Sequence, residues 1–598
     1  MPSHHHAWSC ALVALACNVE LTKPVGGDSP VEAQPVERAA TPPPPITGGT
    51  LLVTRDGAFA IASDPDRDVV HVVDLATLQE TATIALASGA RPFRAAEDAA
   101  GRVHVTLRGT GQLATIDPRS GELSSIVGVC PNPRGIAHDE ARDAMAIACA
   151  GGELVTLAAD DRQLLARRML VPDLRDVFVE HGTTYVSRFR SAEVLEVLDE
   201  GTTQAGAPES PTVGAVLRTP GTAWRTVPHR DGGWVMLHQL ATSTPLPAPP
   251  PGGGGDFSQA IPEGYGGITP CGGASNPSIT VVFDDGSQIG SGPIAGIALA
   301  VDVAISPDGW TVAIASPSQH RQRDLETKLA SLTTYPLLNF TAPDECRDPN
   351  PSIATDDFVA VAYAPDGRLL ALTRSRPQLY VFAAQDPDDH EVVELEGDEI
   401  RDTGHDLFHL DAHRGISCAS CHPEGGDDGR VWAFVDQGPR RTQPLDVGID
   451  GTAPFHWRGD MADLPTLVHE VRQRRMGGAV LSDAHVEAFS DWLLAIPKKN
   501  PERSAADTMV EAGAALFDTL GCRSCHAGAA LTNNAAADLG MGSLQIPNLH
   551  GVAMRPPYMH DGRCTTLHCA TTEMLAATRP DVANDEQVDA LVAYLESL

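Results

Sequence analysis

The chain of 598 residues is short of aromatic side chains, basic side chains and long apolar runs. Phe, Trp and Tyr make up 5% of the residues, which argues against a repeat array built around tryptophan. The 43 Lys and Arg are outnumbered by 78 Asp and Glu, giving a net charge of −35. Such a surface repels nucleic acid and anionic lipid. No run of 18 apolar residues follows the N-terminal region, so we expect no membrane-spanning helix.

What the chain does contain is the spacing Cys-x-x-Cys-His, at residues 418–422 and again at 522–526. Two thiols one helical turn apart can add to the two vinyl groups of a haem, and the adjacent His then binds the iron. A redox-active cysteine pair or half a zinc site would not explain a His in both fifth positions. The sequence therefore predicts two covalently bound c-type haems. Their attachment thiols and proximal ligands would be Cys418, Cys421, His422, Cys522, Cys525 and His526.

The N-terminal region has the outline of an export signal. Residues 7–16 are apolar, and Ala16 precedes Cys17 as at a bacterial lipoprotein cleavage site, although no Lys or Arg comes before them. We interpret residues 1–17 as a signal with lipid on Cys17. An ordinary secretory signal or a wrongly assigned start is the alternative. The expected location is the periplasm, the outer membrane or the cell surface, with the lipid as the only membrane anchor.

Six cysteines lie outside this region and outside the haem motifs, and three disulfides would use them all. Proximity favours Cys130–Cys149 and Cys564–Cys569, which leaves Cys271–Cys346. Six cysteines nevertheless allow fifteen pairings. Disulfides and covalent haem are both consistent with an oxidising compartment.

Residues 18–49 are Pro-rich and predict an extended tether. From 50 to 392, short apolar strands alternate with Gly and Asp turns, at first about 40 residues apart, which is the size of a propeller blade. Seven turns predict an all-β propeller of about seven blades, with a pair of β-sandwiches as the alternative. The turns are Asp56-Gly57, Ala100-Gly101, Arg142-Asp143, His181-Gly182, Asp231-Gly232, Asp308-Gly309 and Asp366-Gly367.

One interval between these turns is too long for a blade. The 77 residues from Gly232 to Gly309 require an insertion, and the Pro- and Gly-rich residues 245–275 predict an irregular excursion there. The turns at 306–309 and 364–367 resemble those of bacterial propellers of the surface-layer repeat type. That resemblance implies an architecture and no activity.

After the propeller the pattern becomes helical and duplicated, which predicts two tandem all-α cytochrome c domains over 393–500 and 501–598. Similar segments, 404–408 and 513–517, precede the two haem motifs. Each half ends in a helix with one apolar face. These faces consist of Val486, Phe489, Trp492, Leu493 and Ile496, and of Val588, Leu591, Tyr594, Leu595 and Leu598.

The last 200 or so residues resemble the bacterial di-haem cytochrome c peroxidase superfamily, which includes the di-haem enzyme that matures methylamine dehydrogenase. The resemblance rests on residues 522–528, 531–532, 546–549 and 557–562 and on Met574, twelve residues after Gly562. It implies that Met574 is the sixth ligand of an electron-accepting haem, where a thioether favours reduced iron. Without the resemblance, Met554 and Met559 would be equal candidates.

The first haem half resembles the same superfamily more loosely, through residues 438–441, 454–459 and 462–464. Peroxidases have a Trp between their two haems in this frame. The resemblance therefore implies that Trp457 is an electron bridge, and a packed core Trp is the alternative.

The first half also departs from the superfamily. No His occurs between His422 and His456, where the peroxidases carry a distal His. The first iron is thus either open, which favours peroxide chemistry, or bound by another group, which favours electron transfer alone. Candidate groups are Met461, His469, Met476, His409 and His413, although His405, His409 and His413 also fit a solvated or core-lining helix face.

Together these features predict an exported di-haem c-type cytochrome that transfers electrons, coupled or not to hydrogen peroxide reduction, with the propeller as a docking or sensing module. A non-catalytic electron-transfer lipoprotein with both irons six-coordinate is the alternative. The expected partner is an electron-donor protein, and the acidic surface suits a basic one. The resemblance also allows a calcium ion between the haem halves, with no ligand set to name. An active site in the propeller is disfavoured because its His residues are scattered among the blades.

Overall fold

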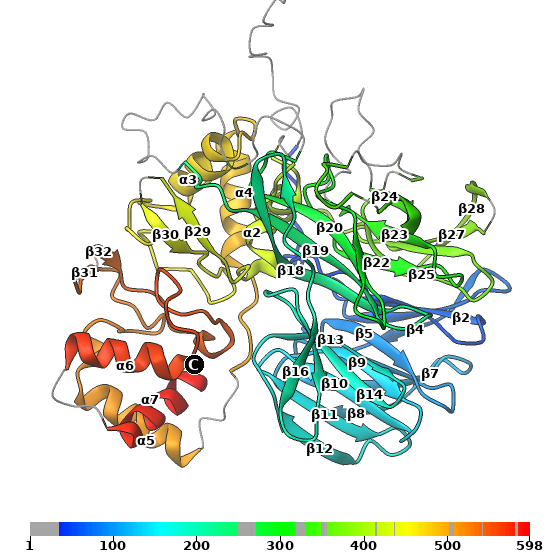
Figure 1. Ribbon diagram of the computed structural model, residues 1–598, viewed down its shortest axis with the longest axis horizontal. Helices are drawn as coiled ribbons and strands as arrows, with labels where there is room; N and C mark the ends of the chain where they lie inside the picture. Colours follow the sequence, from blue (N-terminus) through cyan, green and yellow to red (C-terminus); the bar gives the residue numbers. More distant parts are fainter. Residues whose placement is uncertain are drawn as a thin grey trace, which may run out of the picture.

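In the computed structural model, the strands between residues 51 and 394 and the helical region after them lie side by side (Figure 1). The structure describes residues 35–247, 265, 271–317, 331–340, 342–347, 353–354, 356–384, 386–412, 415–435, 437–501, 507–540, 542–579 and 584–598. The predicted export signal and Cys17 lie outside these residues. Within them, no helix is long and apolar enough to cross a membrane.

Seven antiparallel sheets follow one another along the chain and form a seven-bladed propeller. The first long strands of neighbouring blades contact each other all the way round the ring. The first three blades consist of β1 (Leu51–Val53), β2 (Phe59–Asp64), β3 (Val69–Asp74) and β4 (Gln79–Ala85); of β5 (Pro92–Glu97), β6 (Val103–Leu107), β7 (Gln112–Asp117) and β8 (Glu122–Gly128); and of β9 (Pro133–Asp139), β10 (Ala144–Cys149), β11 (Glu153–Ala158) and β12 (Leu164–Met169). The fourth and fifth blades consist of β13 (Leu174–Glu180), β14 (Thr183–Arg188), β15 (Val194–Val197) and β16 (Thr202–Gly206), and of β17 (Thr212–Val213), β18 (Val216–Pro228), β19 (Trp234–Thr242), β20 (Ser275–Val282) and β21 (Gln288–Gly290). The last two blades consist of β22 (Asp302–Ile305), β23 (Thr311–Ala315) and β24 (Leu332–Pro336), and of β25 (Phe358–Tyr363), β26 (Leu369–Thr373), β27 (Gln378–Ala383) and β28 (Asp386–Glu394).

The seven predicted turns are confirmed, because each joins the first long strand of a blade to the next strand. The ring closes without strand exchange, since β1–β4 and β25–β28 each form a complete sheet. Side chains join these two blades: Arg67 donates to the Ser375 carbonyl oxygen at 2.8 Å, and Arg374 pairs with Asp66 at 2.7 Å. The propeller prediction is therefore confirmed in preference to a pair of β-sandwiches.

The predicted tether is wrong over the described part of residues 18–49. Residues 43–50 are mostly buried between the propeller and the helical half. The Trp492 indole donates to the Pro43 carbonyl oxygen at 2.9 Å, and the Ile46 N–H donates to His409 Nε2 at 3.0 Å. Proline keeps a chain extended and removes N–H donors, which suits a packed strap as well as a free tether. Composition alone therefore could not tell the two apart.

The predicted excursion lies between β19 and β20 of the fifth blade, and it leaves the propeller. Leu246 donates its N–H to the Ala433 carbonyl oxygen at 2.8 Å and accepts from the Val435 N–H at 3.0 Å. It thereby pairs with β29 (Val431–Phe434), which forms a hairpin with β30 (Gly438–Arg441). A propeller loop thus adds to a sheet of the first haem half.

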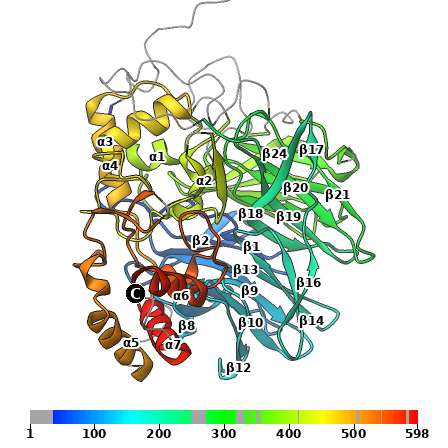
Figure 2. The ribbon, with the colours of Figure 1, turned by 60° about the vertical axis from the view of Figure 1, so that its left-hand side comes forward.

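The helical region has two halves, one with α1–α4 and one with α5–α7, which lie one above the other in Figure 2. Its helices are α1 (Thr403–His409), α2 (Cys418–Cys421), η3 (Pro423–Gly425), α3 (Leu464–Leu467), the π-helix η4 (Val468–Arg475), α4 (Asp483–Leu494), α5 (Thr508–Thr519), η5 (Cys522–Ser524), η6 (Val552–Met554), α6 (Leu567–Thr578) and α7 (Asp585–Glu596). A short hairpin, β31 (Ala536–Asp538) and β32 (Ser543–Gln545), lies in the second half.

The same helix crossing occurs in both halves and confirms the predicted duplication. Helix α1 packs on α4, and α5 packs on α7. A Cβ added to Gly404 would lie 2.4 Å from the Ala488 carbonyl oxygen, and one added to Gly513 would lie 1.9 Å from that of Ala590. Only glycine allows such close backbone contact. The predicted apolar faces of α4 and α7 lie at these crossings and are largely buried.

The three predicted disulfides are confirmed: Cys130–Cys149, Cys271–Cys346 and Cys564–Cys569. The second of these links the returning end of the β19–β20 excursion to the segment between β24 and β25. The excursion is therefore covalently tied to the propeller at its base.

A buried carboxylate joins the first haem motif to the propeller. Glu424, two residues after His422, accepts from Arg108 and Arg175 of the propeller, both at 2.6 Å. Only 6% of its side chain is exposed. The two guanidinium groups hold the pKa of Glu424 well below its usual range, although burial opposes this. We call these three side chains the Glu424 clamp.

The Gly513 crossing gives a first prediction. Gly513→Ala should lower the local stability of α5 and α7 by about 2 kcal/mol, because the clash with the Ala590 carbonyl exceeds the gain in helix propensity of about 1 kcal/mol. Hydrogen exchange of the α5 and α7 amides would measure this. Gly128→Ala is the matched control, since nothing lies within 4 Å of its added Cβ. Unchanged exchange in the Gly513 variant would contradict the described packing.

The Glu424 clamp gives a second prediction. Glu424→Gln should destabilise the protein by about 3 kcal/mol at neutral pH, because it leaves two buried guanidinium groups without a counter-charge. A carboxyl with a lowered pKa stabilises the fold above its unfolded pKa of about 4.3, and that contribution is lost as pH falls. The difference between variant and parent should therefore be constant from pH 6 to 8 and shrink below pH 4.

Thermal unfolding at several pH values would measure this difference. Glu487→Gln is the control, since Glu487 is 69% exposed in its pair with Arg38 and exposed pairs contribute little. Equal effects of the two substitutions would contradict the role of the clamp.

Candidate haem sites and the cavity between them

The first haem motif forms α2, which is held against the propeller. The Ser417 N–H donates to Ser420 Oγ at 3.0 Å, and Ser420 Oγ donates to the Ala298 carbonyl oxygen at 2.9 Å. His422 Nδ1 lies 3.1 Å from the Gly426 carbonyl oxygen. Since a carbonyl can only accept, Nδ1 carries the proton and Nε2 keeps its lone pair for a metal.

The second motif presents the same thiol and imidazole groups, but on a 3-10 helix in place of an α-helix. Its cysteines begin and follow η5, and His526 Nδ1 donates to the Leu531 carbonyl oxygen at 3.0 Å. Burial lowers the pKa of both His422 and His526, so both rings are neutral near pH 7. Each motif therefore presents a neutral imidazole that is oriented by a backbone carbonyl.

The four thiols are unpaired. Burial raises the pKa of Cys418 to about 11, that of Cys421 well above the usual thiol range, and that of Cys522 upward. Raised pKa values keep Cys418, Cys421 and Cys522 protonated near pH 7, which does not match a reactive redox pair. These thiols do suit covalent addition to vinyl groups, which leaves each sulfur as a neutral thioether.

Both motifs line one continuous cavity of about 790 Å³. Its wall is mostly apolar, and its charged side chains are all arginine: Arg440, Arg441, Arg472, Arg475, Arg555 and Arg579. Arg441 Nε and Arg472 Nε and Nη1 are buried without a hydrogen-bond partner. Apolar walls, buried cations and two oriented imidazoles fit haem, whose flat apolar ring carries two propionates.

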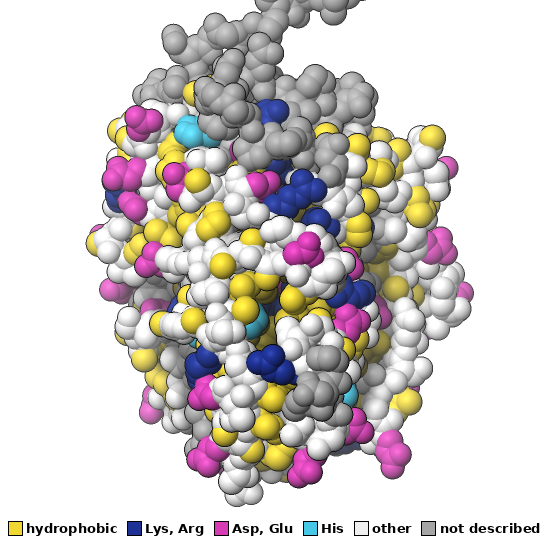
Figure 3. Space-filling model, turned by 90° about the vertical axis from the view of Figure 1, so that its left-hand side faces the viewer, with side chains coloured by type: hydrophobic (Ala, Val, Ile, Leu, Met, Phe, Trp, Pro, Cys, Tyr) yellow, Lys and Arg dark blue, Asp and Glu magenta, His cyan; other side chains and the backbone are white. Residues whose placement is uncertain are grey.

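Figure 3 faces the helical halves and shows Lys and Arg side chains among apolar ones on this side. The chain as a whole has a net charge of −35. The absence of Asp and Glu among the described residues that line the cavity therefore sets it apart from the surface.

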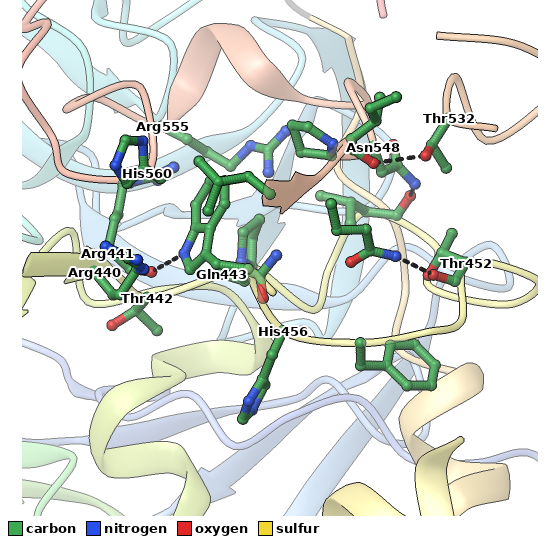
Figure 4. Close-up of a pocket in the computed structure, with 18 of the residues that line it drawn as sticks. Arg440, Arg441, Thr442, Gln443, Thr452, His456, Thr532, Asn548, Arg555 and His560 are labelled. Carbon is green, nitrogen blue, oxygen red and sulfur yellow. Dashed lines mark hydrogen bonds between the residues drawn. The ribbon is translucent and has the colours of Figure 1, made fainter. Parts of the chain in front are cut away.

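Between the two motifs lies a polar junction (Figure 4), where Arg441 and Arg555 lie near His560. Trp457, predicted from the resemblance as an electron bridge, lines the cavity here. Its indole donates to the Arg441 carbonyl oxygen at 2.7 Å, and its ring centre is 6.2 Å from that of His560. Its own carbonyl accepts from Gln545 of β32 at 2.8 Å. Trp457 thus contacts both halves, which is where a bridge would have to lie.

Met574, the predicted sixth ligand in the second half, lies on α6 and lines the cavity. Met559 lines it too, whereas Met554 is buried elsewhere and its sulfur accepts from Asn132 at 3.5 Å. The geometry therefore removes one of the three methionines and leaves Met574 and Met559.

Among the candidate ligands of the first iron, only Met476 lines this cavity within the described residues. Both ring nitrogens of His409 are engaged, Nδ1 by the His405 carbonyl oxygen and Nε2 by the Ile46 N–H. Met461 is fully buried away from the cavity, and His469 bonds Gln473 at a separate small pocket. His413 lies outside the described residues.

Of the predicted stripe of His residues before the first motif, the described members His405 and His409 line the core, as one of its two interpretations allowed. The rings of His405 and His409 lie 4.1 Å apart, and both contact Trp492 of α4. Neither lines the cavity. The stripe therefore stabilises the α1–α4 crossing.

Two cavity residues were not singled out from the sequence. His456 lies beside Trp457 and has a left-handed backbone, with φ of +69°. Tyr265 belongs to the β19–β20 excursion, and its hydroxyl lies 3.3 Å from Arg475 Nη1. His456 lies inside the matched segment 454–459, but its residue type alone gave it no role there. Tyr265 gave no signal, because it is more than 150 residues away from the first motif.

No calcium ligand set can be named from the described residues. There, the groups of three metal-binding side chains that come together are Cys130, Cys149 and Glu153, and Cys564, Cys569 and Glu573. Each contains a disulfide, and disulfide sulfurs are not thiolate ligands.

Residues 508–595 match the family model described as cytochrome c oxidase, cbb3-type, subunit III. The matched segment contains the second haem motif and Met574. A cytochrome c domain implies covalently bound haem and electron transfer. The search of curated proteins found no match.

Solved structures with similarity to the chain include hydrazine synthase of Kuenenia stuttgartiensis, at 12% identity and a TM-score of 0.42, covering 60% of this chain and 98% of that one. Virginiamycin B lyase from Staphylococcus aureus aligns at 9% identity and a TM-score of 0.35, covering 56% and 94%. Dihydro-haem d1 dehydrogenase NirN in complex with DHE aligns at 17% and 0.34, covering 59% and 67%. All three TM-scores lie below 0.5.

Proposed function

We propose that this protein is an exported di-haem c-type cytochrome of the peroxidase-like superfamily, with one haem on each Cys-x-x-Cys-His motif. One observation carries the proposal: both motifs open into a single cavity, each with its His oriented by a backbone carbonyl. When bound, haem supplies a one-electron redox centre and, at an open coordination position, peroxide reduction.

The chain's own residues would hold and orient the two groups. The four cysteines bind covalently, and His422 and His526 are the proximal ligands. Arg441 and Arg555 bind propionates at the junction. Met574 completes the second site, and Trp457 carries electrons between the halves. The second haem receives electrons and the first passes them on or uses them.

Two versions of the first site are supported by different residues. An open first iron that reduces hydrogen peroxide is supported by the mostly apolar cavity, with Arg472 and Arg475 in its wall. A six-coordinate first iron in a non-catalytic electron carrier is supported by Met476, which lines the same cavity.

Partner and location follow from the sequence. The electron donor is a protein, and the acidic surface favours a basic one. Lipid on Cys17 would anchor the protein at the periplasmic or cell-surface side of a membrane. A calcium ion between the haem halves stays a prediction from the resemblance.

The two-haem proposal predicts haem number directly. The protein matured in a host that attaches c-type haem should carry two haems per chain by the pyridine haemochrome assay. The double variant C418A/C421A should carry one, and so should C522A/C525A, because a haem without thioether bonds is lost on acid–acetone extraction. C564A/C569A also removes two cysteines and should keep both haems. An unchanged haem number in C418A/C421A would contradict the first site.

The peroxidase version predicts a high-spin electron-spin signal in the oxidised or half-reduced protein, together with peroxide consumption. Half-reduction must be included, since members of this superfamily can open the site only in that state. Fully low-spin iron in both states, with no reaction with peroxide, would instead support the non-catalytic carrier.

A further inference from the structure

A row of buried ion pairs runs from the propeller to the wall of the cavity between the haem motifs. Arg190, which follows β14, pairs at 3.0 Å with Asp173 of the same blade and at 3.0 Å with Asp427 of the first haem half. Asp427 in turn pairs with Arg441 at 3.1 Å. None of these four side chains is more than 7% exposed, so salt and solvent screen their charges only weakly.

Arg441 is the member of this row that lines the cavity. Its backbone is fixed by its neighbours at the junction: its N–H donates to the His560 carbonyl oxygen at 2.7 Å, and its carbonyl accepts from the Trp457 indole at 2.7 Å. Its guanidinium donates through Nη2 to Asp427 Oδ1. The position of the Arg441 guanidinium therefore depends on Asp427, which does not itself line the cavity.

Asp427 also lies next to the group that orients the first proximal ligand. It directly follows Gly426, whose carbonyl oxygen lies 3.1 Å from His422 Nδ1. Burial lowers the pKa of His422, and the Gly426 carbonyl and the Asp427 carboxylate oppose that shift. The charge of Asp427 therefore reaches the first haem site. Burial raises the pKa of Asp427, but the guanidinium groups of Arg441 and Arg190 outweigh burial and hold that pKa well below its usual range, so the carboxylate is charged at neutral pH.

We propose that Arg190 and Asp427 are positioning residues that set the reduction potential of the first haem. Arg190 of the propeller holds Asp427, and Asp427 holds Arg441 in the cavity wall. The inference rests on the proposed function, because it requires a haem on the first motif. A negative charge near an iron favours the oxidised state, and a positive charge favours the reduced state. Loss of the Asp427 charge should therefore raise the potential, whereas loss of the Arg190 charge leaves Asp427 less compensated and should lower it.

The test is a spectroelectrochemical titration of the di-haem protein at neutral pH, in which the ratio of reduced to oxidised first haem is compared at one fixed potential. Asp427→Asn should raise this ratio about tenfold, since one buried unit charge is removed; for one electron, tenfold is about 59 mV. Arg190→Gln should lower the ratio about threefold, because Arg190 is one ion pair further from the cavity. The same titration of C522A/C525A, which keeps the haem of the first motif, assigns the signal.

Conservative and matched variants separate charge from structure. Arg190→Lys and Asp427→Glu keep the charges, and the ratio should stay within twofold of the parent. Arg374→Gln and Asp66→Asn are the matched controls, because Arg374 and Asp66 form a propeller pair at 2.7 Å that is no more than 9% exposed and does not line the cavity. They too should leave the ratio within twofold.

Shifts of opposite sign in Asp427→Asn and Arg190→Gln support the positioning role, since a general loosening of the structure would move both potentials in the same direction. Shifts of the same sign, or shifts no larger than those of the controls, in proteins that carry two haems would overturn it. If Asp427→Asn does not fold, Arg190→Gln is compared with Arg190→Lys, and equal ratios in these two variants overturn the proposal. A parent protein with one haem per chain would instead refute the proposed function, and the pyridine haemochrome assay distinguishes the two failures.

Discussion

The Glu424 clamp is the contact on which the arrangement of the first site depends. The Glu424 carboxylate can be buried because it pairs with two guanidinium groups, those of Arg108 and Arg175, which come from different blades. Glu424 has a left-handed backbone with φ of +54°, and the next residue, Gly425, packs against Pro45 of the strap. Such a conformation persists only where surrounding contacts fix it. The Gly426 carbonyl that orients His422 follows directly.

The first haem half is therefore a composite structure, whereas the second is largely self-contained. The strap at residues 43–50, the Leu246 strand, Tyr265 and the Ala298 carbonyl all come from the propeller side and contact the first half. The second half meets the propeller through fewer groups, such as Asn132 with the sulfur of Met554. The family model matches residues 508–595 of the second half, although both halves share the glycine-mediated helix crossing. Under the proposed function the propeller would be more than a docking module, because its residues Leu246, Tyr265 and Ala274 line the cavity.

Local patterns in the sequence predicted the features of the fold that interactions between residues close in the sequence determine. The Gly and Asp turns predicted the blades because positive φ is needed at each hairpin, as at Gly57 and Gly367. The apolar faces of α4 and α7 predicted the helix crossings because burial follows the 3.6-residue period. The strap, Glu424 and Tyr265 gave no such signal. Each is held in position by a partner hundreds of residues away in the sequence. A Pro-rich or charged segment has the same sequence pattern whether it is free in solvent or packed against the protein.

Among the described residues that line the cavity the charged side chains are all arginine, although the chain as a whole is acidic, and this contrast would affect the redox potential of a bound haem. Each guanidinium near an iron favours the reduced, less positive state, and propionates in contact with Arg441 and Arg555 would offset part of that effect. Burial lowers the pKa of Arg555 to about 10, still well above neutral pH, so the group stays charged. Under the proposed function, the haem propionates would supply that offset at the junction, whereas at Arg472 the acid that acts on the charge is Asp411. The two irons would then experience different electrostatic fields although their proximal ligands are the same, and that asymmetry would favour one direction of electron transfer between the halves.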